Sequence, residues 1–417
     1  MKTTRRLFLR GSAAMAATAA AAPALAQSVI DEIINSPRRG AWNDQFDAGA
    51  GRTSQVLSTM PTLSAATASH VERSIMQYAD IVARGGWPVV PARKRLELGV
   101  IDPDVEVLRR RLMISGDLSQ RAGMSPAFDT YVDSALKRFQ VRHGLPADGV
   151  SGAHTFAALN VSAPIRLGQL ETNLVRLRSM SGFLGDRYVM VNIPAAQIEA
   201  VENGRVALRH TAIVGKVDRQ TPILNSKINE VIINPYWNAP QSIVRKDIIP
   251  LMRENPDYLR DNNIRILAPN GDEIDPMTID WSTDEAANLR FRQDPGKINA
   301  MASVKINFPN PHAVYMHDTP QQSLFRDQAR FHSSGCVRVQ NVRDLVTWLL
   351  RDTEGWDRQR FERTIQTEED ISVPLGNPVP VYFTYISAWS NEDGVVHFRD
   401  DIYGRDGVDE LQISTAL

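Results

Sequence analysis

The chain has 417 residues, of which 43% are hydrophobic and 23% are charged. At about 100–200 residues per domain, this length indicates two or three domains, each with enough apolar residues for a core. The 47 lysines and arginines nearly balance the 48 acidic residues, which gives a net charge of -1. This balance does not favour a nucleic-acid-binding protein, which would carry a basic stripe. The single cysteine excludes both a disulfide within the chain and a cysteine-based zinc cluster.

The first 26 residues have the three parts of a secretory signal peptide. A basic start precedes an apolar run over 11–22, and an Ala-x-Ala site ends at Ala26. The pair Arg5-Arg6 resembles that of a twin-arginine export signal. The alternative is a membrane anchor, but the alanine-rich run is too short to span about 30 Å. We therefore expect residues 1–26 to be cleaved, leaving a periplasmic chain without a membrane span.

The next part of the chain predicts an arm, a helical scaffold and a small helical module. Residues 27–100 begin as an extended arm, and a helical run then opens at Ser64 and ends at the segment 85–88 (Gly-Gly-Trp-Pro). Residues 101–162 predict three short helices, with the three arginines at 109–111 turned toward solvent. A further helix over 163–184 is expected to pack against the scaffold.

A short string within the module carries a family resemblance. Residues 135–140 (Ala-Leu-Lys-Arg-Phe-Gln), followed by 143–145 (His-Gly-Leu) and 148–149 (Asp-Gly), resemble the peptidoglycan-binding helical module. The alternative is a generic three-helix bundle. Because the module contains no nucleophile with a base, we expect it to bind the wall through exposed residues such as Arg138 and Arg142.

After Gly185 the apolar residues alternate with a period of two, which predicts a mainly β domain over 185–390. Expected strands lie at 188–193, 206–215, 230–234, 314–317 and 379–386. Residues 240–296 are polar and helical in character, and predict a capping insertion. Residues 391–417 are expected to form a C-terminal tail.

The sole cysteine, Cys336, follows the small residues Ser333-Ser334-Gly335 and precedes an apolar helical pattern that starts at Val342. A turn close to a helix start presents backbone N–H groups, which would lower the thiol pKa and could hold an oxyanion. His317, at the end of an expected strand, is a candidate base. The alternatives are a buried, inert cysteine and a surface histidine. Neither alternative explains the small-residue turn, the following arginine and the secreted setting together.

The segments 315–320 (Tyr-Met-His-Asp-Thr-Pro) and 333–338 (Ser-Ser-Gly-Cys-Val-Arg) resemble the signature of L,D-transpeptidases of the YkuD family. The segments 234–240 and 399–404 resemble the large periplasmic branch of this family. The resemblance implies an α+β multidomain chain: a mainly β catalytic domain with a helical capping insertion, a three-helix peptidoglycan-binding module and a helical scaffold.

The resemblance also implies roles for single residues. Cys336 would be the nucleophile and His317 its base, while the backbone carbonyl of Asp318 would orient the imidazole. The backbone amides of Ser334, Gly335 and Cys336 would stabilise the oxyanion, and Arg338 would support the loop or meet a substrate carboxylate. Many members have histidine where this chain has Ser334. Whether His332 assists instead, or has only a surface role, stays open.

The implied reaction is the formation of 3→3 cross-links between peptidoglycan stem peptides through a cysteine thioester, with no cofactor and no metal. Carbapenems are the expected inhibitors. Two alternatives remain: a cysteine hydrolase (an L,D-carboxypeptidase or amidase), and a non-catalytic protein that binds wall glycan and peptide. The sequence lacks a His-Glu-x-x-His zinc motif, and also the Ser-x-x-Lys and Lys-Thr-Gly pair of penicillin-binding serine enzymes.

Overall fold

The structure is a computed structural model that describes residues 58–407. The expected signal peptide over 1–26 and most of the expected arm lie outside the described residues. None of the helices within 58–407 is both long enough and apolar enough to cross a membrane.

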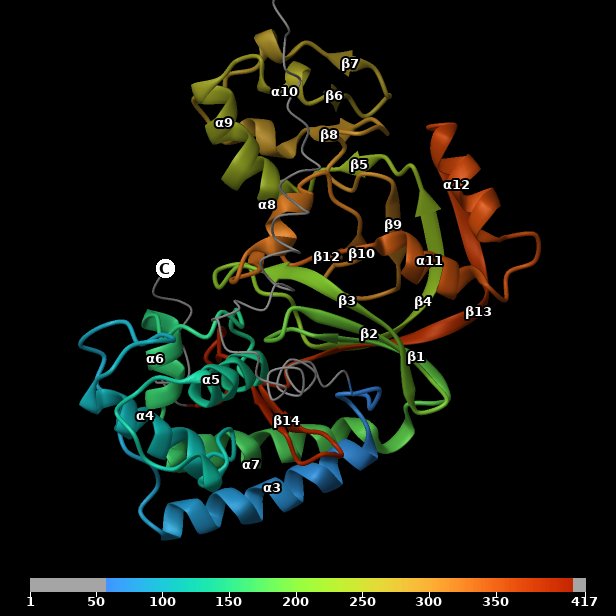
Figure 1. Ribbon diagram of the computed structural model, residues 1–417. Helices are drawn as coiled ribbons and strands as arrows, with labels where there is room; N and C mark the ends of the chain where they lie inside the picture. Colours follow the sequence, from blue (N-terminus) through green and yellow to red (C-terminus); the bar gives the residue numbers. More distant parts are fainter. Residues whose placement is uncertain (1–57, 408–417) are drawn as a thin grey trace, which may run out of the picture. The chain divides into compact units, whose positions relative to one another are not determined.

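Two long helices form the scaffold. Helix α3 (Ala65–Ala83) begins as predicted at Ser64, whose hydroxyl accepts a hydrogen bond from the backbone N–H of Thr67. It ends before Gly85 and Gly86, which both have positive φ angles. Helix α7 (Ala163–Met180) packs along it, as expected (Figure 1), and its buried leucines share a core with α3 and strand β1.

The module contains three helices around a separate apolar core: α4 (Pro103–Ile114), α5 (Thr130–Arg142) and α6 (Ala153–Asn160). A 3-10 turn, η1 (Gln120–Ala122), connects the first two. Asp102 and Asp129 cap α4 and α5 by accepting backbone N–H groups at the helix starts. The third helix is short and starts after Gly152 without a side-chain cap.

The prediction that residues 109–111 face solvent is wrong for Arg109 and Arg111, which are both buried. Arg109 pairs with Asp129 at 2.5 Å. Arg111 donates from Nε to the carbonyl of Leu159 at 2.8 Å, and its guanidinium lies 3.8 Å from the centre of the Trp87 ring. A guanidinium can enter a core in this way because its stem is apolar and its planar head stacks on aromatic rings.

Arg142 is also buried, which contradicts its expected place on the exposed surface of the module. Its Nε and Nη2 donate to the carboxylate of Asp117 at 2.7 and 2.6 Å, and its Nη1 donates to the carbonyl of Val396. Arg138 donates to the carbonyl of Asp117. The end of α5 therefore holds the module against the C-terminal part of the chain.

The mainly β domain is built on a sheet that closes on itself, with strands in the order β11-β3-β12-β10-β9-β4-β13-β1-β2. An additional pairing of β2 with β3 closes it into a barrel. The strands are β1 (Arg187–Asn192), β2 (Gln197–Glu202), β3 (Arg205–Gly215), β4 (Leu224–Ile233), β9 (Val304–Asn307), β10 (Met316–His317), β11 (Phe331–Ser333), β12 (Val337–Val339) and β13 (Ile371–Thr384).

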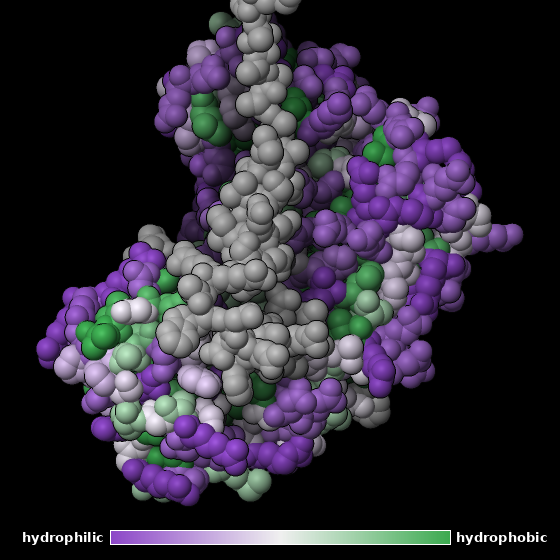
Figure 2. Space-filling model, viewed as in Figure 1, coloured by the Kyte–Doolittle hydropathy of each residue, from purple (hydrophilic) through white to green (hydrophobic). Residues whose placement is uncertain are grey.

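Two helices complete the barrel domain. Helix α11 (Val342–Leu350) contributes five buried apolar residues to the barrel core, and α12 (Arg358–Gln366) contributes Phe361. The outer face of α12 is mainly hydrophilic in Figure 2, as expected for a helix that buries one narrow stripe. The short 3-10 helices η2 (Ser181–Phe183) and η6 (Gln322–Arg326) lie in connecting segments.

The insertion over 240–296 is less helical than expected. It contains α8 (Gln241–Ile243), the π-helical segment η3 (Val244–Ile248), α9 (Ile249–Glu254), α10 (Tyr258–Asp261) and two 3-10 turns, η4 (Pro276–Thr278) and η5 (Glu285–Asn288). A four-stranded antiparallel sheet accompanies them: β5 (Trp237–Asn238), β8 (Arg290–Gln293), β6 (Ile264–Leu267) and β7 (Glu273–Ile274). These strands are too short for a period of two to stand out in the sequence. The insertion has its own apolar core.

Residues 391–407 are not a loose tail. Strands β14 (Ala388–Ser390) and β15 (Val396–Phe398) form a hairpin, and Phe398, Asp401 and Ile402 are buried. The expected tail is therefore a structural part of the domain, at least as far as residue 407.

Candidate active site

The register of three neighbouring strands places His317 beside two cationic residues. Strand β10 pairs in parallel with β12 and antiparallel with β9, so that His317 lies opposite Arg338 on one side and Lys305 on the other. Met316, one residue earlier, is buried in the barrel core. Because side chains alternate along a strand, His317, Lys305 and Arg338 share the opposite face of the sheet.

Cys336 lies on this same face, because it precedes Arg338 by two residues. The N–H of the next residue, Val337, donates to the carbonyl of Tyr315 at 3.0 Å, which puts Cys336 opposite Tyr315 at the start of the β10–β12 pair. Burial raises the pKa of Tyr315, and the neighbouring Cys336 acts in the same direction. The rings of Tyr315 and His317 are 5.5 Å apart. The structure therefore brings Cys336 and His317 onto neighbouring strands.

His317 is buried and has one defined hydrogen bond. Its Nδ1 is 2.5 Å from the backbone carbonyl of Asp318, which can only accept, so Nδ1 carries the proton and Nε2 is left with a lone pair. Burial lowers the pKa of His317 to about 3, and the positive charges of Arg338 and Lys305 act in the same direction. At neutral pH the imidazole is uncharged and able to accept a proton.

The Cys336 thiol does not have the lowered pKa expected from its sequence context. Burial raises the pKa of Cys336 to about 11, and the neighbouring Tyr315 and the charges of Lys305 and Arg338 only partly oppose this. The helix does not follow the cysteine directly, because strand β12 lies between Cys336 and α11 in the chain. The resting pair is therefore a neutral thiol beside a neutral imidazole.

The loop before the cysteine is held by its own hydrogen bonds. The Gly335 N–H donates to the Ser333 hydroxyl at 3.2 Å, and this hydroxyl donates to the Cys336 carbonyl at 2.5 Å. Gly335 has a φ of 114°, a conformation that favours glycine. Of the three expected oxyanion donors, the Gly335 amide is thus already engaged. The amides of Ser334 and Cys336 donate to no other group within residues 58–407.

The remaining predicted residues have different surroundings. Arg338 donates to Gln321 at 2.7 Å, while its Nε is buried without a partner among residues 58–407. The Nε2 atom of His332 is 3.0 Å from Asp327, and no contact with Cys336 is found within the described part of the chain. No group of three or more His, Cys, Asp or Glu side chains within residues 58–407 could hold a metal ion.

Sequence reasoning missed Lys305 as a part of the site. Its Nζ lies 4.6 Å from the centre of the Tyr315 ring, and burial lowers its pKa. A lysine in a short strand carries no sequence signal of this kind, since only the register of β9 against β10 places it opposite His317.

Arg219 was also missed, and it connects the insertion to the cysteine loop. It donates to both carboxylate oxygens of Asp247, in η3, at 2.6 and 3.0 Å. Its Nη1 also donates to the Ser334 hydroxyl at 2.9 Å. The insertion is therefore fastened at a point two residues from Cys336. We call residues 240–296 the cap from here on.

A series of buried hydrogen bonds supports the cysteine loop (residues 333–336). The Thr221 hydroxyl donates to the Gly335 carbonyl at 2.9 Å, and the Thr221 N–H donates to the Tyr403 hydroxyl. That hydroxyl in turn donates to the carbonyl of Gly215, in β3, at 2.6 Å. Tyr403 thus braces both the loop and the strand next to it.

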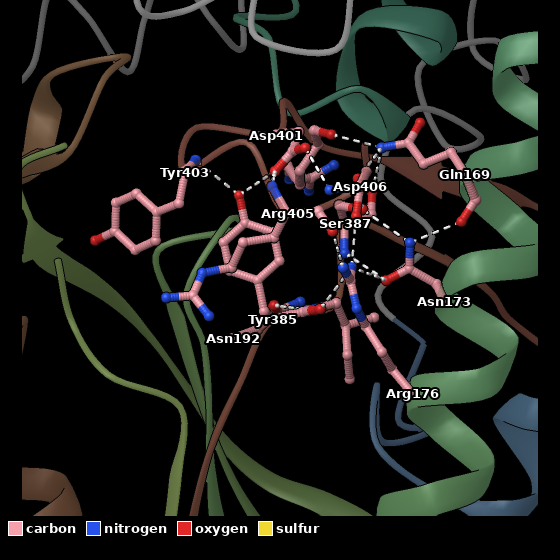
Figure 3. A network of polar contacts seen from close by, with 12 residues as sticks. Gln169, Asn173, Arg176, Asn192, Tyr385, Ser387, Asp401, Tyr403, Arg405 and Asp406 are labelled. Atoms are coloured by element: carbon pink, nitrogen blue, oxygen red, sulfur yellow. Dashed lines mark hydrogen bonds and ion pairs between the residues drawn. The ribbon is translucent and has the colours of Figure 1, made fainter. Parts of the chain in front are cut away.

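This hydrogen-bond network continues from Tyr403 to helix α7, as Figure 3 shows. The Tyr385 hydroxyl accepts from the Tyr403 N–H and donates to Asp401. The same segment is bound to α7, where Arg176 pairs with Asp406 at 2.5 Å and Gln169 donates to the Arg399 carbonyl at 3.0 Å. Residues 399–406, expected as part of a tail, therefore lie between the scaffold helix and the cysteine loop.

Comparison with known proteins agrees with this architecture. Residues 186–381 match the YkuD family model, described as the L,D-transpeptidase catalytic domain, and residues 102–159 match a family described as "Putative peptidoglycan binding domain". The chain is 36% identical over 239 residues to a Haemophilus influenzae protein named "Putative L,D-transpeptidase". That match covers 57% of this chain and 48% of the relative, so the chain spans about half the length of this relative.

Two solved structures are among those similar to the chain. The L,D-transpeptidase (Yku) from Stackebrandtia nassauensis is 13% identical, with a TM-score of 0.26, over 74% of this chain and 99% of that one. The catalytic domain of the E. faecium L,D-transpeptidase, acylated by ertapenem, is 11% identical, with a TM-score of 0.23, over 49% of this chain and 100% of that one.

The class of the barrel domain follows from its architecture together with these matches: residues 186–381 match the L,D-transpeptidase catalytic domain, and the helical module matches the putative peptidoglycan binding domain. The chain carries a catalytic domain of the YkuD family next to a peptidoglycan-binding domain.

Proposed function

We propose that this protein is a periplasmic L,D-transpeptidase that forms 3→3 cross-links between peptidoglycan stem peptides, with Cys336 as nucleophile and His317 as base. The observation that carries this proposal is the fixed tautomer of His317. Its Nδ1 is bonded to the Asp318 carbonyl, which leaves Nε2 as the base on the face that it shares with Cys336.

In the first half-reaction, Nε2 of His317 takes the thiol proton as Sγ attacks the carbonyl carbon of the third stem residue. The amides of Ser334 and Cys336 are the donors available for the oxyanion. The imidazolium that forms lies between Lys305 and Arg338, whose positive charges favour its return to the neutral form. Proton transfer to the leaving D-amino acid is favoured for this reason, and a thioester remains.

In the second half-reaction, the amine of a second stem attacks the thioester carbonyl and gives its proton to His317. The new amide is the cross-link, and the Cys336 thiolate that leaves takes the proton back from His317. Arg338 is suited to a substrate carboxylate, because it is partly buried and its Nε has no partner among residues 58–407. The peptidoglycan-binding domain would hold the enzyme on its polymeric substrate.

Water as acceptor would make the protein an L,D-carboxypeptidase or amidase instead. The cap, fastened beside the cysteine loop through Arg219, favours exclusion of water and so favours the amine. The test is mass spectrometry of products from two purified tetrapeptide stems. We expect a cross-linked dimer that has lost one D-amino acid, and none with Cys336→Ser. Tripeptide alone would identify a hydrolase, while no turnover with retained wall binding would identify a binding protein.

Export to the periplasm is a separate part of the proposal and depends on the residues before position 27. The twin-arginine pattern motivates it. Fractionation of cells that express the full chain should find the mature protein in the periplasm, and Arg5→Lys with Arg6→Lys should retain the precursor inside the cell. Unchanged export of the double variant would contradict the twin-arginine route.

A further inference from the structure

Lys305 lies on the accessible face of the three strands that carry the candidate active site. Strands β9, β10 and β12 are neighbours in the sheet (Figure 1), and Lys305 is directly opposite His317. The alternate residues of these strands, Ile306, Met316 and Val337, are buried in the barrel core. Lys305 and Cys336, on the other face, are both partly exposed. A substrate that reaches the thiol can therefore also reach the Lys305 side chain.

Lys305 forms no ion pair with another residue in the part of the chain that the structure describes. Its Nζ lies 4.6 Å from the centre of the Tyr315 ring, a cation–π contact that does not neutralise the ammonium. Burial lowers the pKa of Lys305, and the groups that oppose this are Cys336 first, and then Glu230 and Asp370. Lys305 is therefore coupled more strongly to the nucleophile than to either carboxylate.

Glu230, on β4, is committed to other partners. Its two carboxylate oxygens accept hydrogen bonds from the Ser372 hydroxyl and from the Asn307 side chain, the latter at 3.0 Å. These two hydrogen bonds lower the pKa of Glu230 most, and the charge of Lys305 contributes less. A carboxylate from a substrate can therefore bind Lys305 without displacing an existing ion pair.

The order of the strands separates the two halves of a donor substrate. Sγ of Cys336, which directly precedes β12, takes the acyl carbon, and Nε2 of His317, on β10, must reach the leaving amine to protonate it. Lys305, on β9, is one strand further in the same direction, at the usual strand spacing of about 4.8 Å. In an α-amino acid the amine nitrogen and a carboxylate oxygen are at most about 3.6 Å apart. The carboxylate of the leaving group therefore falls beside Lys305.

Arg338 lies on the other side of His317, on the strand that follows the nucleophile. Because it comes two residues after Cys336, it is placed beside the acyl part of the donor. A carboxylate that stays on the thioester is within its range, whereas one that departs with the amine is on the side of Lys305. The two cations are thus divided between the two products of the first half-reaction.

We propose that Lys305 binds the carboxylate of the leaving D-amino acid, and so selects donor stems whose fourth residue has a free carboxylate. The proposal rests on the proposed function, because it assumes a stem peptide as the donor. The same position serves the second half-reaction, since the entering amine approaches the thioester where the first amine left. An acceptor amine with a carboxylate on the adjacent carbon, as in diaminopimelate, gains this contact, and water does not. Lys305 therefore also favours aminolysis over hydrolysis.

The test compares two donors that differ in one charge: the tetrapeptide L-Ala-γ-D-Glu-diaminopimelate-D-Ala, and the same peptide ending in D-alaninamide. Mass spectrometry measures the initial rate at which the full-length enzyme releases the fourth residue. We expect Lys305→Met to lower the acid-to-amide ratio of kcat/KM by about tenfold or more, the usual effect of losing a charge-assisted hydrogen bond. Lys305→Arg, which keeps the charge, should preserve the preference. Lys227→Met, a change of an exposed lysine on β4, is the matched control.

The ratio is informative because misfolding or a general loss of activity affects both donors equally. A binding measurement decides the question if Lys305→Met turns over too slowly. Calorimetric titration of the full-length Cys336→Ser protein, in which no thioester forms, gives the affinity for each stem. The acid should bind more tightly than the amide, and Lys305→Met in this background should remove the difference.

Two results would overturn the proposal: the same acid-to-amide ratio in the wild type and in Lys305→Met, or equal binding of the two stems to the Cys336→Ser protein. With the acidic donor, Lys305→Met should raise the share of tripeptide over cross-linked dimer, and an unchanged share would refute the role in the second half-reaction. The two proposals fail separately. Cross-linking with a ratio that does not depend on Lys305 would refute only the selection of donors. Preferential binding of the acid through Lys305, without any thioester on Cys336 of the wild type, would refute only the proposed reaction.

Discussion

Arg219 and Asp247 form a two-point ion pair between the barrel domain and the cap, with N–O distances of 2.6 and 3.0 Å. The same guanidinium reaches the Ser334 hydroxyl, so the position of the cap and the position of the cysteine loop are coupled through one side chain. The pair lies beside a five-residue π-helical segment, a distortion that is often found at functional sites.

Removing this ion pair should loosen the cap. We expect Arg219→Gln and Asp247→Asn each to increase hydrogen exchange over residues 241–254 by up to about fivefold, since a partly exposed pair contributes at most about 1 kcal/mol. The double variant should match the single ones. Arg260→Gln, an exposed change within the cap, is the control. If the cap also excludes water, the ratio of hydrolysis to cross-linking should rise with the exchange rate; unchanged exchange would rule out this ion pair as the fastening.

Carbapenems should acylate Cys336, and His317 should set the rate. The neutral thiol has a pKa of about 11, so a base must remove its proton before the sulfur can open a strained lactam. Intact-protein mass spectrometry should show one adduct, on the peptide that contains Gly335-Cys336. His317→Ala should slow its appearance by about a hundredfold or more. Equally fast acylation of this variant would show that the thiol is activated without the histidine.

The protein should lose stability in acid through its buried histidines. Burial lowers the pKa of His317 and of His397 to about 3, from an ordinary value of 6.5, and lowers that of His143 well below 6.5. Because the unfolded state binds these protons more readily, this contribution is present above pH 6.5 and is lost as the pH falls toward 3. Each histidine contributes a slope of up to about 1.4 kcal/mol per pH unit.

Denaturant unfolding between pH 7 and pH 4 measures this slope. His317→Gln should flatten the acid limb, while His312→Gln, at an exposed position, should leave it unchanged. The Cys336 thiol affects stability at alkaline pH instead. Because its pKa is raised to about 11, its contribution to the free energy of unfolding is complete below about pH 9 and is lost as the pH rises above it. An acid limb that is equally steep in His317→Gln would show that this residue is not the cause.

Arg142→Gln should unfold the module rather than weaken wall binding selectively. Both partners of the Arg142–Asp117 pair are buried, and removal of the cation leaves an uncompensated carboxylate. Breaking such a pair typically costs about 3–5 kcal/mol. Denaturant unfolding should show this loss, and Arg110→Gln, an exposed change on α4, should show almost none. Normal stability together with reduced wall binding would instead support a surface role for Arg142.

The candidate active site could be predicted from the sequence only as far as its local signals reach. His317 ends an expected strand and Cys336 lies in a small-residue turn, and the sequence indicated that a strand end and a turn of this kind could bring the two side chains together. Lys305 joins them only through strand register, and Arg219 only through the insertion. Contacts of this kind depend on residues far apart in sequence, and no local pattern encodes them.

The electrostatics were harder to predict than the geometry. The sequence indicated a thiol near a helix start, but β12 lies between Cys336 and α11, and burial dominates the pKa of the thiol. Arg111 was expected in solvent for a similar reason: its charge suggests exposure, whereas its stem and its planar head fit against Trp87. In both cases the property was inferred from the type of side chain alone, whereas burial of that side chain determines it.

The brace from Tyr403 to the cysteine loop gives the end of the chain a role in the order of assembly. A polypeptide made only as far as α12 already has every motif residue, yet it lacks β13 of the barrel and the hydroxyl that fixes Thr221 beneath Gly335. The cysteine loop can therefore reach its supported form only after residue 403 has been made. A chain cut shortly after Phe398 would retain both signature segments but would lack the Tyr403 hydroxyl that supports the loop.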